Sequence, residues 1–372
     1  MSINEIILYI MVIFMTLGAI DKCIGNKFGL GEKFDEGFIA MGSLAIAMVG
    51  VVSLAPVLAQ ILKPIVVPVY TFLGADPAMF ATTLLACDMG GYPLALELAQ
   101  TEAAGNFAGL ILGSMMGPTI VFTIPVALGI INKEDHKFLA SGVLAGMITI
   151  PIGCFVGGLA AGYDIKMIIS NLIPIILVAI LIAIGLWRIP NKMINGFNIF
   201  GKGVVIVITV ATAAIIIETL TGFVVIPGMA PISDGIAIIG SIAIVLCGAF
   251  PMVYFITKVF KNPLMKLGKA LGMNDVSAAG MVATLANNIP MFGLMKDMDD
   301  RGKVLNVAFA VSAAFVFGDH LGFTAGVNKE MIFPMIVGKL VAGVTAVMVA
   351  SLIAPKASLQ KAPTIEEDAI QS

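Results

Sequence analysis

Asp88-Met89-Gly90-Gly91-Tyr92-Pro93 interrupts an otherwise apolar segment that runs from residue 76 to residue 100. A second apolar segment, 275–297, is interrupted in the same way at Asn287-Asn288-Ile289-Pro290. Each half of such a segment holds about 12 residues, or about 18 Å of helix, because an α-helix rises about 1.5 Å per residue. That length is too short to cross a hydrocarbon core about 30 Å thick. We therefore predict that both segments are re-entrant hairpins, each entering and leaving the membrane on one side.

The composition of the chain places these segments in a membrane protein. Of the 372 residues, 59% are hydrophobic and 12% are charged, whereas a soluble domain is about 45–50% apolar and about 25% charged. The formal net charge of −2 gives no attraction to nucleic acid. The four cysteines form no CxxC pair and indicate neither a disulfide framework nor a zinc site. The stretch from Ser2 to Ile20 lacks the basic region of a signal peptide, so we expect it to be a first spanning helix.

Apolar runs long enough to cross the bilayer predict an all-α fold with about nine transmembrane helices. With the N-terminus outside, only Lys63, Lys166 and Lys329 of the 21 lysines and arginines fall on the outer side. All the others except Lys339, which lies within a span, fall on the inner side, as the positive-inside rule requires. Counting either hairpin as a full span would reverse every later loop, so this asymmetry favours the hairpins and a cytoplasmic C-terminus. The predicted spans are 3–20, 38–57, 104–131, 138–160, 165–187, 203–226, 235–257, 303–325 and 331–354.

The two halves of the chain resemble each other at an offset of 200 residues, which aligns Asn106 with Asn306. The same offset places Leu84-Leu85-Ala86-Cys87-Asp88 over Thr284-Leu285-Ala286-Asn287-Asn288. The helix after each hairpin is broken, at Gly117-Pro118-Thr119 in the first half and at Gly318-Asp319-His320 in the second. Because the first hairpin enters from outside and the second from inside, the pattern predicts an inverted-topology repeat, the plan of secondary transporters.

The repeat predicts the domain organisation and the place of the binding site. We expect one membrane transport domain, 1–354, built from repeat one (1–160), a linking helix (165–187) and repeat two (203–354). Residues 355–372 would form a short cytoplasmic tail. The two hairpin tips would meet near the centre of the bilayer, where irregular backbone is tolerated only against protein or a water-filled cavity.

The residues at this meeting point favour a cation with a polar group. Asp88 and Asp319 are acids inside the membrane, where a charge costs about 2.5–3.5 kcal/mol and needs a partner or a purpose. Asparagine amides suit a neutral polar group, and aromatic faces suit an ammonium. The predicted substrate-binding residues are Asp88, Tyr92, Asn287, Asn288, Phe292, Asp319 and His320. No metal site or cofactor is expected.

Simpler roles are open for several of these residues. Asp88 and Asn288 could instead be helix caps that satisfy hairpin backbone groups. Asp319 and His320 could be a local pair that caps the broken helix, rather than a binding or proton-relay site. Glu218 and Lys339 form a separate case, because each lies at a similar depth from the outer end of its helix. We predict that these two form a structural ion pair.

Three unusual stretches carry a resemblance to a known family: ACDMGGYPLA (86–95), ANNIPMF (286–292) and FGDHLGF (317–323). With them the chain resembles, over residues 3–354, the ethanolamine transporter (permease) family of bacterial ethanolamine-utilisation operons. The resemblance implies import of ethanolamine across the bacterial cytoplasmic membrane for use as a carbon and nitrogen source. The predicted architecture is also similar to that of concentrative nucleoside transporters, and analogy suggests a homo-oligomer.

The chemistry of ethanolamine agrees with the residues at the hairpin tips. A primary amine is largely protonated at neutral pH, as lysine is, so Asp88 suits its ammonium and Asn287 or Asn288 suits its hydroxyl. The alternative is a transporter of the same fold for another small polar solute, such as a nucleoside or an amino acid. An intramembrane enzyme is disfavoured, because the chain contains no HExxH, GxSxG or P-loop motif.

Overall fold

The computed structural model describes residues 1–356, except for the side chains of residues 260, 261 and 264. This part of the chain is helical and contains no strand, as the composition predicts. Most of the predicted tail, from residue 357 onward, lies outside the described residues. The α-helices are α1 (Ile3–Cys23), α2 (Leu30–Phe72), α3 (Ala78–Leu84), α4 (Gly91–Leu98), α5 (Glu102–Asn106), α6 (Met116–Pro118), α7 (Ile124–Ile130), α8 (His136–Met147), α9 (Ile150–Ala160), α10 (Ile165–Arg188), α11 (Pro190–Thr221), α12 (Ile232–Ala270), α13 (Asp275–Thr284), α14 (Ile289–Leu294), α15 (Asp300–Ala313), α16 (Asp319–Val327) and α17 (Ile332–Ile353).

Eight helical stretches within residues 1–356 are long and apolar enough to cross a bilayer. They coincide with eight of the nine predicted spans, so the chain is a multi-pass membrane protein. The stretches are Ile3–Cys23, Leu30–Phe72, Glu102–Ile130, Lys133–Ala160, Ile165–Arg188, Pro190–Thr221, Ile232–Val259 and Lys329–Ile353.

The ninth predicted span, 303–325, is not one continuous helix and is not among these eight stretches; it is broken, as the sequence predicts at Gly318-Asp319-His320. α15 ends at Ala313 and α16 begins at Asp319. Between them Phe315 has a φ of 63°, a left-handed conformation that a bulky residue adopts only under constraint. The Phe315 N–H donates to the Thr284 carbonyl at 3.2 Å, and the Phe317 N–H donates to the Leu285 carbonyl at 3.0 Å. These bonds replace helical ones, because backbone inside a membrane must find internal partners.

Both interrupted segments form pairs of short helices. In the first segment α3 packs against α4, and a 3₁₀ turn, Cys87–Met89, lies between them. The chain reverses at Gly90, whose φ of 90° is readily adopted by glycine alone. The Ala86 carbonyl accepts a bond from the Gly91 N–H at 2.8 Å and so closes the turn. In the second segment α13 packs against α14, and the Asn287 carboxamide oxygen accepts a bond from the Ile289 N–H at 2.8 Å.

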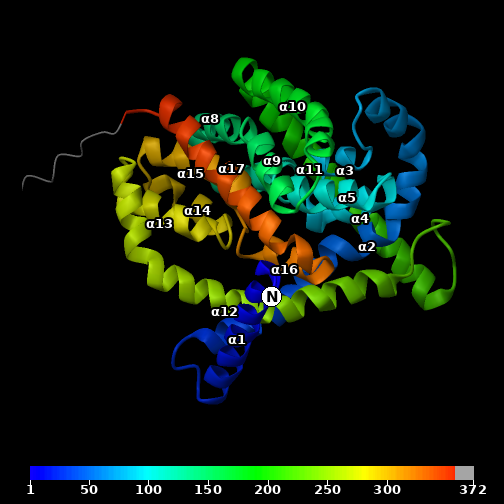
Figure 1. Cartoon of the computed structure of the whole chain (residues 1–372), viewed down its shortest axis with the longest axis horizontal. Coiled ribbons are helices and arrows are strands. Elements are labelled where there is room, and N and C mark those ends of the chain that lie inside the picture. Colours follow the sequence, from blue (N-terminus) through cyan, green and yellow to red (C-terminus); the bar gives the residue numbers. More distant parts are fainter. Residues whose placement is uncertain (357–372) are drawn as a thin grey trace, which may run out of the picture.

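The long helices frame these short pairs (Figure 1). α2 and α12, which are 43 and 39 residues long, pack against each other. α1 packs on α12, and α11 packs on α2. α15 and α17 lie in the middle of the molecule, where α15 contacts α8 and α17 contacts both α8 and α9. α15 and the first short pair, α3–α4, are therefore largely buried in the protein, whereas the second pair, α13–α14, lies nearer the edge of the molecule (Figure 1).

Replacement of Gly146 tests the tight packing of α8 on α15. A Cβ atom on Gly146 would lie 2.4 Å from the Cβ of Val311, whereas a Cβ on Gly240 of α12 would have no neighbour within 4 Å. We expect Gly146→Ala to destabilise the protein by about 1–3 kcal/mol through overpacking, and Gly240→Ala to leave stability unchanged or raise it. The melting temperatures of the purified variants in detergent measure the difference. Equal melting of the two variants would contradict the packing described.

Candidate functional site

Two acidic side chains from distant parts of the sequence line one small cavity. Its volume is about 40 Å³, and its polar lining consists of Asp88, Asp319 and His320. Met89, Phe122 and Phe315 are among the apolar side chains that close it. The aromatic rings of Phe122 and Phe315 lie edge to face, with centroids 5.7 Å apart. The two carboxylates therefore share a small space that is bounded largely by apolar groups.

Local breaks in the helices bring these acids to the cavity. Asp88 lies in the 3₁₀ turn between α3 and α4 and is half-buried. Asp319 is the first residue of α16, directly after the break that separates α15 from α16. His320 follows it and is 3% exposed. The sequence analysis predicted that these three residues come together, and in the structure all three line the same cavity.

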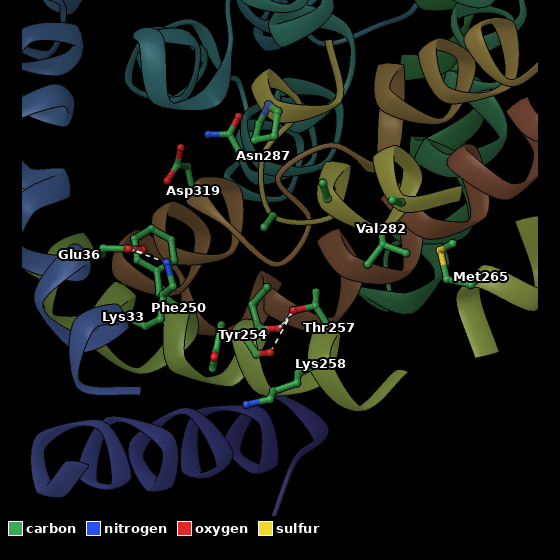
Figure 2. A pocket seen from close by; sticks show the side chains of 15 residues that line it. Lys33, Glu36, Phe250, Tyr254, Thr257, Lys258, Met265, Val282, Asn287 and Asp319 are labelled. Carbon is green, nitrogen blue, oxygen red and sulfur yellow. Dashed lines mark hydrogen bonds and ion pairs between the residues drawn. The ribbon is translucent and has the colours of Figure 1, made fainter. Parts of the chain in front are cut away.

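A second, larger cavity adjoins the small one at Asp319. Its volume is about 630 Å³, and it lies against α12, α13 and the N-terminal end of α2. Figure 2 shows Asn287 and Asp319 together at one end of this cavity, and Lys258 toward the other end. Lys33 and Glu36 also line it and form an ion pair of 2.5 Å. Because Asp319 lines both cavities, it stands between the large cavity and the small one.

Three predicted site residues lie elsewhere. Asn288 is fully buried, and its amide nitrogen donates to the Thr123 hydroxyl at 3.1 Å. The Tyr92 hydroxyl donates to the Asn106 carboxamide oxygen at 3.3 Å. Phe292 is 1% exposed and belongs to the hydrophobic core. Among the described residues, none of these three lines the small or the large cavity.

The structure adds Lys339, on α17, to the polar groups around the small cavity. Its Nζ lies 3.0 Å from Nδ1 of His320 and donates to the backbone carbonyl of Ser114. Ser114 is four residues before Pro118, which has no N–H, so the Ser114 carbonyl loses its usual helical donor. The Lys339 ammonium takes the place of that donor. The sequence already places Lys339 within a predicted span, and a charged residue inside a membrane is a candidate for a functional site.

The predicted ion pair between Glu218 and Lys339 is not formed. Lys339 is bonded to Ser114 and His320, and the ion pairs among the described side chains involve other residues. Glu218 Oε2 is buried without a hydrogen-bond partner in the described part of the chain. Similar depth did not bring the two together, since α11 packs mainly against α2 whereas α17 packs against α8, α9 and α15.

Cys87 extends the polar cluster and raises the question of a metal. Ligand atoms of Cys87, Asp88 and His320 lie within 4.8 Å of one another, and zinc accepts such sulfur, oxygen and nitrogen donors. The Lys339 ammonium, 3.0 Å from the same histidine, opposes a divalent cation at this position. Cys87, Asp88 and His320 would therefore hold a metal ion only against the charge of this lysine.

The chain is similar to known proteins over nearly its whole length. A family model described as "Ethanolamine utilisation protein, EutH" matches residues 3–353. "Probable ethanolamine permease EutH" of Listeria monocytogenes serotype 1/2a (strain 10403S) is 70% identical over 371 residues, which cover 100% of this chain and 99% of the relative. The protein of the same name from Escherichia coli (strain K12) is 56% identical over 394 residues, covering 96% and 97%.

The Bacillus subtilis (strain 168) protein YxeR, described as uncharacterized, is 55% identical over 361 residues that cover 97% of this chain and 98% of the relative. No solved structure matches the chain. The family model spans nearly the whole sequence, and the relatives match it over nearly their full length, so the resemblance inferred from the three sequence motifs is confirmed. The chain belongs to the EutH family of ethanolamine utilisation proteins.

Proposed function

We propose that this protein imports ethanolamine, as the protonated amino alcohol, across the bacterial cytoplasmic membrane by alternating access. The observation that carries the proposal is the small cavity between Asp88 and Asp319, which meets the large cavity at Asp319. Relatives that match the whole chain are named probable ethanolamine permeases, which supports the same substrate here.

The size of the small cavity suits this substrate. One water needs about 10–15 Å³, so a cavity of about 40 Å³ accommodates about three such spheres. Ethanolamine has four non-hydrogen atoms, two carbons, one nitrogen and one oxygen, so it needs slightly more room than three such spheres. A nucleoside is several times larger, and an amino acid would bring a carboxylate to face Asp88 and Asp319. The volume and the charge of the cavity therefore favour ethanolamine over the alternative solutes.

The polar groups give each end of the substrate a partner. The ammonium donates to Asp88 and Asp319, and such charge-assisted hydrogen bonds are about twice as strong as neutral ones. Asn287 lies beside Asp319 at the end of the large cavity and offers an amide to the hydroxyl on the way in or out. His320 lines the small cavity and offers a second polar contact there.

We infer that the short helix pairs, α3–α4 and α13–α14, are re-entrant hairpins of an inverted repeat. In support, α1 packs on α12 while α11 packs on α2, which are the exchanged contacts that a pseudo-twofold axis generates. Repeat one (1–160), the linking helix (165–187) and repeat two (203–354) then form a single transport domain. Alternating access moves one part of this domain against the other and exposes the site to each side of the membrane in turn.

The orientation follows from the charges. Lys33 and Lys258, which line the large cavity, belong to the lysine-rich side that the positive-inside rule places in the cytoplasm. The N-terminus is then outside and the C-terminus inside. On this basis the large cavity opens inward, and the conformation described is the inward-facing state of the transporter.

Substitution of Asp88 tests the substrate and the cation site together. In proteoliposomes at pH 6, we expect uptake of labelled ethanolamine by the parent protein. Asp88→Asn should reduce it at least about tenfold, because losing one member of a buried charge pair costs about 2–5 kcal/mol. Asp297→Asn, at an exposed aspartate, is the matched control and should transport normally. Equal uptake by a folded Asp88→Asn variant would return Asp88 to the role of a helix cap, and no uptake by the parent would overturn the proposed substrate.

The need for the protein should depend on pH. The ammonium form dominates in acid, and the neutral amine, which crosses lipid unaided, grows as the pH rises toward the amine pKa. A deletion strain supplied with low ethanolamine should therefore lose most uptake at pH 6 and progressively less at alkaline pH. Uptake of labelled substrate over a pH series measures this. A deficit of the same size at every pH would argue against import of the cation.

Thiol labelling tests the proposed topology. In a Cys23→Ser background, the three remaining cysteines are buried, so a new cysteine reports its own position. A membrane-impermeant maleimide should label Lys258→Cys only from the cytoplasmic side and Lys63→Cys only from outside. Labelling of both from the same side would mean that the first short pair, α3–α4, crosses the membrane as a full span.

A further inference from the structure

We propose that Lys339 sets the charge selectivity of the binding site, as a resident ammonium that leaves room for one positive charge in the substrate. The inference rests on the proposed function, because it concerns the same cavity. It assigns a role to Lys339, which is buried and which the transport scheme above does not use. Lys339 is 1% exposed and lies on α17, away from the lysine-rich ends of the spans.

The position of the ammonium is fixed by neutral partners rather than by an acid. Nζ donates to the Ser114 carbonyl, which is free because Pro118 supplies no N–H. It also lies 3.0 Å from His320 Nδ1. Within the described part of the chain no carboxylate lies at ion-pair distance from Lys339. With the amine protonated, its charge is therefore not cancelled by an ion pair and acts on the cavity that His320 lines next to it.

The contact with Lys339 also fixes the state of His320. When Lys339 is protonated, its ammonium has three donors and no acceptor, so His320 Nδ1 accepts the hydrogen bond. The ring is then neutral, with its proton on Nε2, and contributes no charge. A protonated ring would place two cations 3.0 Å apart in a buried site.

The formal charge of the site follows from these states. Asp88 and Asp319 line the cavity; with both carboxyl groups ionised they contribute two negative charges, and Lys339 contributes one positive charge. The empty site carries −1, and a bound monocation brings it to zero. A dication would leave an excess of +1 and a neutral molecule would leave −1. An uncompensated charge is strongly unfavourable in a buried site, so the loaded site selects one ammonium.

The test is a competition assay with the full-length protein in proteoliposomes at pH 6. Unlabelled ethanolamine and ethylenediamine each compete with labelled ethanolamine uptake. Ethylenediamine has nearly the same size but carries a second ammonium in place of the hydroxyl at this pH. For the parent, ethylenediamine should compete at least tenfold less well than ethanolamine.

Lys339→Met, which keeps the length of the side chain and removes its charge, should change the site from −1 to −2. The ratio between the two competitors should then shift at least tenfold in favour of ethylenediamine. Lys339→Arg should keep the parental ratio, because it keeps the charge. Lys329→Met, at an exposed lysine, is the matched control and should also keep it.

Each outcome separates the inference from the proposed function. If the parent does not take up ethanolamine, the proposed function fails and this inference fails with it. If the parent takes it up but Lys339→Met lowers both competitors equally, Lys339 is only structural and the inference alone is overturned. If Lys339→Met does not reach the membrane, the competition measured with the parent protein is the test. Equal competition by ethanolamine and ethylenediamine would then overturn charge selection.

Discussion

Backbone groups inside a membrane must find hydrogen-bond partners within the protein, and this constraint determines where the helix breaks of this chain can lie. Each break leaves backbone N–H and C=O groups without helical partners, and lipid offers them no hydrogen bonds. The breaks therefore lie against one another inside the protein. A Cβ on Gly117 would lie 2.0 Å from the Leu85 carbonyl oxygen, and a Cβ on Gly318 would lie 2.1 Å from that of Ala286. In both halves a glycine of the broken helix thus touches the end of the first short helix. Only glycine permits so close an approach of two backbones.

The polar site is a consequence of this arrangement. Because the breaks converge, the side chains at the breaks converge as well, and Asp88 and Asp319 come to one cavity from positions more than 200 residues apart. The missing N–H of Pro118 has the same kind of effect, since it frees the Ser114 carbonyl for Lys339. Charges that would be costly in lipid are thereby placed among donors, acceptors and each other, and the same features that interrupt the helices supply a place for a small cation.

The sequence could predict those parts of the structure that depend on length, polarity and spacing. Eight spans, the interruptions at Asp88 and Asn287, and the convergence of Asp88, Asp319 and His320 follow from apolar run lengths and from the offset between the halves. Tyr92 and Phe292 were misplaced, because near a turn the direction of a side chain depends on packing that no spacing encodes. The Glu218–Lys339 pair failed for a related reason: depth along a helix is readable from sequence, whereas the face that a helix turns to its neighbour is not.

The walls of the small cavity suggest how access to it alternates. On the side of the large cavity the shared residue is Asp319, a carboxylate that a cation can pass. A further space of about 400 Å³ between α2, α3 and α11 is lined almost wholly by apolar side chains, and the residue it shares with the small cavity is Met89. An ammonium has no polar path through these side chains. We propose that the outer side is opened by a movement of α3 and of the 3₁₀ turn that carries Met89. Because Asp88 lies in the same turn, the movement that opens the outer side also carries one of the two substrate carboxylates with it.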